Sequence, residues 1–286
     1  MRFPTTQEII DLDDELAAEG VPLDDRANQA LQRWLKRTKW SGEFLPIARH
    51  FEEQFKLLHP SVRLEGRPFM FLCASGRGVT YEYHPPIIFG ERRISPTDSL
   101  QISPPELERI YQTSAPAYWE LFWQCCDCFD LFMAHMDNVI TDPEAVGFAS
   151  AAKDQLQASA RQLVAMSADA SLPQACAMAT ELAGKALLKQ LGFANVRSLG
   201  HSVPDIYGEI VQRAPAITDG DIVLATARIP EYVNSRYSPP PLSAPEAQRL
   251  FACALFLCSD AFRRISRQSM YFAARQDPTV PERDWS

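Results

Sequence analysis

The sequence has no long apolar run. Its longest uninterrupted apolar stretch is the nine residues 250–258, whereas a helix that crosses a membrane needs about 20. The first residues, Met1-Arg2-Phe3-Pro4, are followed by acidic side chains and lack the apolar core of a secretory signal. We therefore expect no membrane association and a cytoplasmic location.

The chain has 7 cysteines in 286 residues, too few for a disulfide-dense protein, and an odd number does not suit a disulfide framework. Cys125, Cys126 and Cys128 are nearly adjacent, which suits reduced thiols. The chain also lacks internal repeats and low-complexity tracts, and its 46% apolar residues exclude a disordered or collagen-like protein. The length of 286 residues indicates one large domain or two ordinary domains.

Positive charge is not in excess either. The chain carries 36 acidic and 28 basic residues, a net charge of −8, which argues against wholesale coating of nucleic acid. The acidity belongs to residues 1–145, with 23 acidic and 14 basic groups, whereas residues 146–286 have 13 and 14. A local basic surface therefore remains possible in the second half, and the shift in composition predicts a domain boundary near residue 140.

Local signals predict a mainly α fold. A Ser or Thr followed three residues later by Glu, the pattern of a helix capping box, occurs at Thr5, Ser103, Thr141 and Ser243. With the spacing of apolar residues, these signals predict helices over 6–18, 25–38, 43–58, 104–137, 142–168, 173–191, 204–213, 221–233 and 245–274.

One region has the character of a sheet. Residues 67–73 and 79–84 flank a glycine-containing turn at 74–78, and 87–94 follow the Pro85-Pro86 break, which predicts a short antiparallel β meander. We thus expect an acidic α+β region over 1–140, a helical bundle over 141–274 and a tail over 275–286. Small residues three and four apart in 174–191 predict the central helix of that bundle.

Residues from about 150 to 270 resemble the HEPN family, the higher eukaryotes and prokaryotes nucleotide-binding domain. The resemblance is carried, in order, by 179–188 (ATELAGKALL), Gly200-His201-Ser202-Val203, 229–237 (IPEYVNSRY) before a proline-rich break, and the alanine-rich segment 244–264. It implies an up-and-down helical bundle that commonly forms a homodimer. The family occurs in prokaryotic toxin–antitoxin and antiviral defence systems, and many members act on RNA.

Active members of the family are metal-independent endoribonucleases that carry an arginine followed a few residues later by a histidine. Imidazole moves protons near neutral pH, and guanidinium offsets the charge growing on the phosphate. The corresponding pair here is Arg197 and His201, with three residues between them, a shorter spacing than the family's motif. The alternatives are phosphate or partner binding without cleavage, and a structural role in which His201 caps the following helix while Arg197 points to solvent or to a carboxylate.

Further candidates for binding RNA or a partner are Arg236 and Tyr237, which match a family position, and Arg263, Arg264 and Arg267 along the last helix. Basic groups interleaved with aromatic residues can hold phosphates and stack single-stranded bases. A packed tyrosine ring and an ordinary solvated helix face are the alternatives.

Cys125, Cys128 and His135 share one face of a predicted helix, and their side chains are of the kinds that bind zinc. A structural zinc site needs four ligands, usually from two segments, and these residues have apolar neighbours, so we assign them to the core and expect no metal or other cofactor.

The leading hypothesis is a HEPN-domain homodimer that binds RNA or a nucleotide-bearing partner in a prokaryotic defence or toxin–antitoxin system. The first alternative is a metal-independent endoribonuclease that uses His201 and Arg197. The second is a non-catalytic interaction module whose N-terminal half recruits another protein.

Overall fold

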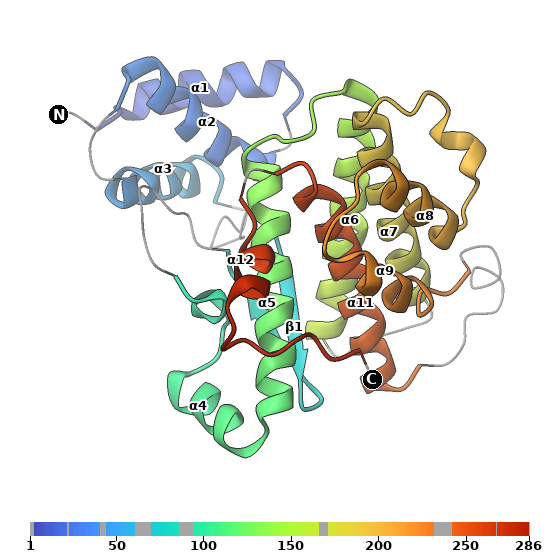
Figure 1. Ribbon diagram of the computed structural model, residues 1–286. Helices are drawn as coiled ribbons and strands as arrows, with labels where there is room; N and C mark the ends of the chain where they lie inside the picture. Colours follow the sequence, from blue (N-terminus) through green and yellow to red (C-terminus); the bar gives the residue numbers. More distant parts are fainter. Residues whose placement is uncertain are drawn as a thin grey trace. The chain divides into compact units, whose positions relative to one another are not determined.

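The computed structural model describes residues 3–21, 23–40, 44–60, 70–85, 94–165, 171–231, 242–266 and 268–285. It is mainly helical with one two-stranded antiparallel hairpin (Figure 1). The chain divides into two compact units, Met1–Arg67 and Pro68–Ser286, rather than near residue 140. Within the described ranges, no helix is long and apolar enough to cross a membrane.

The first unit contains three helices, α1 (Thr6–Ala18), α2 (Leu23–Thr38) and α3 (Phe44–Leu58). Thr5 and Glu8 form the predicted capping box at the start of α1: the Thr5 amide donates to Glu8 at 2.8 Å, and the Glu8 amide donates to the Thr5 hydroxyl at 3.2 Å. The helices pack pairwise around a core that includes Ile9, Leu12, Leu16, Trp34, Phe51 and Phe55.

The second unit begins with the hairpin, β1 (Leu72–Gly76) and β2 (Val79–Tyr83). Its turn is only Arg77-Gly78, both with positive φ (54° and 76°), because the ladder continues to the pair Gly76–Val79. Tyr83 forms a further bridge to Leu100. The third strand expected at 87–94 lies almost entirely outside the described residues.

The helices of this unit follow in chain order. They are η1 (Pro96–Ser99), α4 (Pro104–Thr113), α5 (Ala115–Met136), α6 (Pro143–Val164), α7 (Leu172–Gln190), η2 (Val196–Leu199), α8 (Val203–Arg213), α9 (Asp219–Thr226), α11 (Ala244–Arg263) and α12 (Met270–Gln276).

Two helices expected to be continuous are each divided. The segment 104–137 breaks at Ser114, and 245–274 breaks after Arg263 and restarts at Ser269, which caps α12.

The alanine-rich helix α7 lies at the centre of the second unit, as predicted. It packs against α6, α8 and α11, while α5 packs against α11 and β1 (Figure 1). The α7–α8 contact is close: a Cβ added to Gly184 would lie 2.5 Å from Cγ2 of Ile206. Because α5 and α11 share one core, residues 68–140 belong with the C-terminal half.

Candidate functional site

His201 lies in the loop between η2 and α8, where a buried carboxylate holds its imidazole. Its Nδ1 is 2.9 Å from Oε2 and 3.0 Å from Oε1 of Glu181, so Nδ1 donates to the carboxylate. The Glu181 side chain is only 7% exposed, whereas that of His201 is 56% exposed. A carboxylate in this position fixes both the orientation of the ring and the nitrogen that carries the hydrogen.

Lys185 completes this cluster one helical turn further along α7. Its Nζ donates to Oε1 of Glu181 at 2.7 Å and to the carbonyl of Gly200 at 2.7 Å. The ammonium thereby balances the buried carboxylate and ties α7 to the loop. Gly200 has a φ of 63°, a left-handed conformation that favours glycine and brings its carbonyl to Lys185.

Arg197, in η2, lies at the surface with its side chain 82% exposed. Its Nη2 is 3.4 Å from Oε1 of Glu144, a carboxylate that also pairs with Lys189 at 2.8 Å. The hydrogen bond from Lys189 is the main cause that lowers the pKa of Glu144. Arg197 therefore points to solvent and a carboxylate, as the structural alternative predicted.

The capping role considered for His201 belongs to its neighbour. Ser202 is the N-cap of α8, where its hydroxyl accepts from the Asp205 amide at 3.4 Å. The imidazole of His201 is directed to Glu181 instead. The prediction that His201 caps the helix is therefore wrong, because the shorter hydroxyl side chain fills that position.

Arg263 is not at a surface where RNA could contact it. Its side chain is fully buried, with Nη2 2.5 Å from Oδ1 of Asp127 and Nε 3.3 Å from Oδ2 of Asp130. Its guanidinium lies 4.3 Å from the ring centroid of Tyr271. Although burial acts to lower the pKa of Arg263, the carboxylates of Asp127 and Asp130 raise it. The expectation of an RNA contact is wrong here because the arginine balances buried charge.

Arg264, the residue that follows, is also buried and paired with carboxylates. Its side chain is 1% exposed and pairs with Asp260 at 2.6 Å and Asp219 at 2.7 Å. The prediction that it contacts RNA is therefore also wrong. The remaining candidates Arg236, Tyr237 and Arg267 lie outside the described residues.

The cysteines of α5 belong to the core, as predicted. All seven cysteines of the chain are buried and free, and burial raises the pKa of the Cys125 and Cys128 thiols. His135 donates from Nδ1 to the Leu131 carbonyl at 2.9 Å. In the part of the chain that the structure describes, no group of three or more His, Cys, Asp or Glu residues is placed to hold a metal ion.

Sequence reasoning found His201 and Arg197 but missed Glu181 and Lys185. The available signal was a carboxylate and an ammonium one turn apart in an otherwise apolar, alanine-rich helix.

The chain matches no family model, no curated protein and no solved structure. The site consists of an exposed, oriented imidazole and an exposed guanidinium on the same loop.

Proposed function

We propose that this protein binds RNA as a HEPN-like domain, through the loop that carries Arg197 and His201. The observation that carries the proposal is the pair of exposed side chains on this loop, one of them held in a fixed orientation by Glu181. Guanidinium and imidazole groups donate hydrogen bonds to phosphate oxygens. The resemblance over residues 150–270 supports RNA as the partner, a homodimer as the assembly and a cytoplasmic defence or toxin–antitoxin system as the setting.

The existing ion pair of Arg197 with Glu144 is weak enough for an RNA phosphate to take the place of Glu144. The bond between Arg197 and Glu144 is long and solvent-exposed, and such surface pairs contribute only about 0–1 kcal/mol. A phosphate can therefore replace Glu144 at little cost. Arg263 and Arg264 are committed to buried carboxylates and are not available in the same way.

Fluorescence anisotropy with a labelled single-stranded RNA in EDTA tests the binding. We expect Arg197→Ala to weaken binding and to reduce the slope of log affinity against log salt by about 1. Arg109→Ala is the matched control, because Arg109 is also an exposed, carboxylate-paired arginine, but on α4. Absence of RNA binding at low salt, or equal losses in the two variants, would overturn the proposal.

RNA cleavage is a second candidate, favoured by the hydrogen bond between His201 and Glu181. With the hydrogen on Nδ1, the Nε2 lone pair of His201 can take the proton of a 2′-hydroxyl. The 2′-oxygen then attacks phosphorus, and the 5′-oxygen leaves with a proton from water. The products are a 2′,3′-cyclic phosphate and a 5′-hydroxyl, and Arg197 offsets the charge that grows on the phosphate.

Cleavage is distinguished from binding by incubating the same RNA with the protein in EDTA. If His201 is the base, His201→Ala removes cleavage, and the loss is on the order of 100- to 10,000-fold. His84→Ala is the control, since His84 is an exposed histidine paired with Glu82 on β2. Salt-sensitive binding without any cleavage would support RNA binding as the function and exclude RNA cleavage by His201.

A further inference from the structure

Residues 277–285, which follow α12, form a segment without helix or strand that returns across α5 and α11 (Figure 1). Arg283 and Trp285 are both partly buried, whereas Asp284 between them is exposed. The segment is therefore seated on the second unit through alternate side chains, and its release would break no helix or sheet.

Arg283 is the first anchor of this segment. Its side chain is 6% exposed, and its Nη1 lies 2.6 Å from Oδ2 of the fully buried Asp127 on α5. The guanidinium carbon lies 5.0 Å from the ring centroid of Phe256 on α11 and 4.3 Å from that of Trp285. This arginine thus combines a charge-assisted hydrogen bond with cation–π contacts.

Trp285 is the second anchor. Its Nε1 donates to Oδ1 of Asp221 on α9 at 2.8 Å, and its carbonyl accepts from the guanidinium of Arg228. Its ring meets that of Phe256 edge-on, with the centroids 4.9 Å apart. Asp127, Asp221, Arg228 and Phe256 thus form one surface, the strap surface, that recognises an arginine and a tryptophan two residues apart. These two residue types often dominate binding at protein interfaces.

We propose that the strap surface also binds residues 277–285 of a second copy of this chain, so that two chains exchange their segments. A second copy presents the same two anchors, and the exchange preserves their contacts with Asp127, Asp221 and Phe256. The strap surface is separate from the loop of Arg197 and His201, so the proposal does not depend on RNA binding.

Fluorescence anisotropy with a labelled peptide of residues 277–285 tests whether the strap surface accepts this segment from outside. In the native chain the tethered segment competes with the peptide at a high effective concentration. We therefore expect the peptide to bind the full chain carrying Trp285→Ala at least about tenfold more tightly than the native chain. Equal binding to the two chains, or no binding to the variant, would overturn the proposal.

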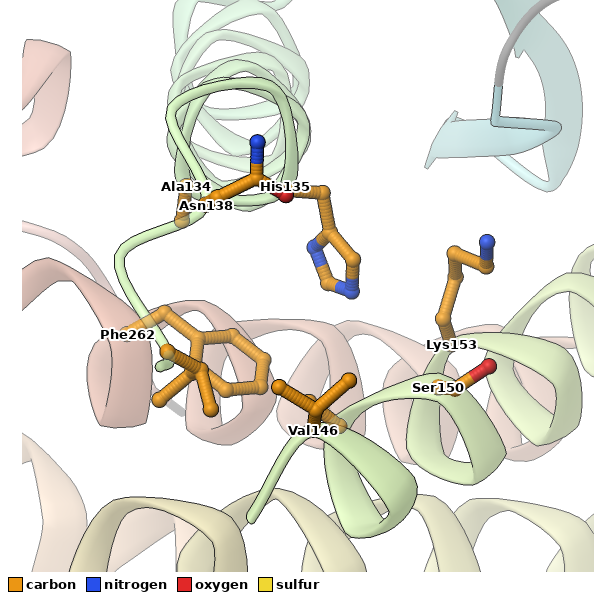
Figure 2. Close-up of a pocket in the computed structure, with 9 residues that line it drawn as sticks. Ala134, His135, Asn138, Val146, Ser150, Lys153 and Phe262 are labelled. Atoms are coloured by element: carbon orange, nitrogen blue, oxygen red, sulfur yellow. The ribbon is translucent and has the colours of Figure 1, made fainter. Parts of the chain in front are cut away.

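Further variants locate the binding. Arg228→Met, placed in the Trp285→Ala chain, removes the donor to the tryptophan carbonyl of the peptide and should weaken binding about tenfold. The control is Lys153→Met. Lys153 lines the cavity of about 100 Å³ that Figure 2 shows, and no residue of the strap surface lines that cavity. Similar losses in both variants would place the binding elsewhere and contradict the proposal.

If Trp285→Ala fails to fold, the indole N–H NMR signal of Trp285 in the native chain provides the test. Saturating unlabelled peptide displaces the tethered segment and shifts this signal if the proposal is correct. An unchanged signal contradicts it.

Exchange between copies is tested by mixing two full-chain variants that carry different fluorophores. Trp285→Ala keeps the strap surface but lacks an anchor, whereas Asp221→Ala combined with Arg228→Met keeps the segment but weakens the strap surface. We expect energy transfer between the two chains that an excess of unlabelled peptide abolishes, because the peptide takes the place of the exchanged segment. Energy transfer that persists in excess peptide, or no energy transfer, contradicts the exchange.

Discussion

At the scale of single residues, buried aspartates on α5 hold the C-terminal part of the chain in place. Asp127 accepts from Arg263 on α11 and, at 2.6 Å, from Arg283 near the C-terminus. Asp130 accepts from the Ser269 hydroxyl at 2.7 Å and from the Met270 amide at 2.6 Å, and so fixes the start of α12. Arg263, which the sequence suggests for a basic surface, therefore has a structural role.

Replacing Arg263 tests this role. We expect Arg263→Met to lower the free energy of unfolding by about 3–5 kcal/mol, because Asp127 and Asp130 then remain buried with less compensating charge. Urea denaturation followed by circular dichroism measures the change. The exposed pair of Arg109 and Glu106 provides the control, and Arg109→Met should cost no more than about 1 kcal/mol. Similar losses in both variants would contradict the structural role.

His135 should make stability depend on pH. Burial lowers its pKa from the ordinary value of 6.5, while the nearby charges of Lys153 and Asp154 act in opposite directions. Below pH 6.5 the unfolded chain therefore takes up a proton before the folded one, and stability falls as the pH is lowered toward the pKa of the folded state.

The measurement is the free energy of unfolding at a series of pH values below 6.5. We expect it to fall less steeply in His135→Gln than in the native chain, with a difference in slope of at most about 1.4 kcal/mol per pH unit. Parallel pH profiles would show that His135 is protonated equally in the folded and unfolded states.

At the scale of elements, the distance between α7 and α8 depends on one glycine. A Cβ at Gly184 would lie 2.5 Å from Cγ2 of Ile206 and 3.1 Å from Cε2 of Tyr207, whereas a Cβ at Gly147 on α6 meets no atom within 4 Å. Glycine is unfavourable inside a helix, so its presence in α7 reflects packing rather than helix formation.

The two glycines make a matched pair of variants. We expect Gly184→Ala to lower the free energy of unfolding by about 1–3 kcal/mol because two helices must separate or repack. Gly147→Ala should instead raise it by up to about 1 kcal/mol through helix propensity alone. Thermal and urea unfolding of both variants provide the measurement, and a stabilising Gly184→Ala would show that the helices are not in close contact.

Element boundaries were the least predictable part of the fold. The capping boxes at Thr5 and Ser243 form as the sequence predicts. At the start of α6, however, Asp142 rather than Thr141 is the N-cap, and its carboxylate accepts from two backbone amides. Thr141 instead accepts a hydrogen bond from Gln190 of α7, a tertiary contact that no local pattern contains.

At the scale of the whole molecule, the two units have separate cores. A fragment of residues 68–286 should therefore unfold cooperatively by itself. A fragment of residues 141–286, cut at the boundary that composition suggested, lacks α5 and leaves Arg263 without Asp127. We expect this shorter fragment to aggregate or to lose its near-ultraviolet circular dichroism. A cooperative unfolding transition of 141–286 would contradict the division of the chain at residue 67.

The sequence by itself determined the helical class, the hairpin, most helix positions and the central place of α7, because these follow from periodicity, capping residues and turn residues close together in the chain. It also singled out His201 and Arg197. Only the tertiary structure decided that Glu181 holds His201 and that Arg263 and Arg264 are buried. The reason is physical: a local pattern shows that a charge is present, but its partner and its burial depend on residues brought together from distant parts of the chain.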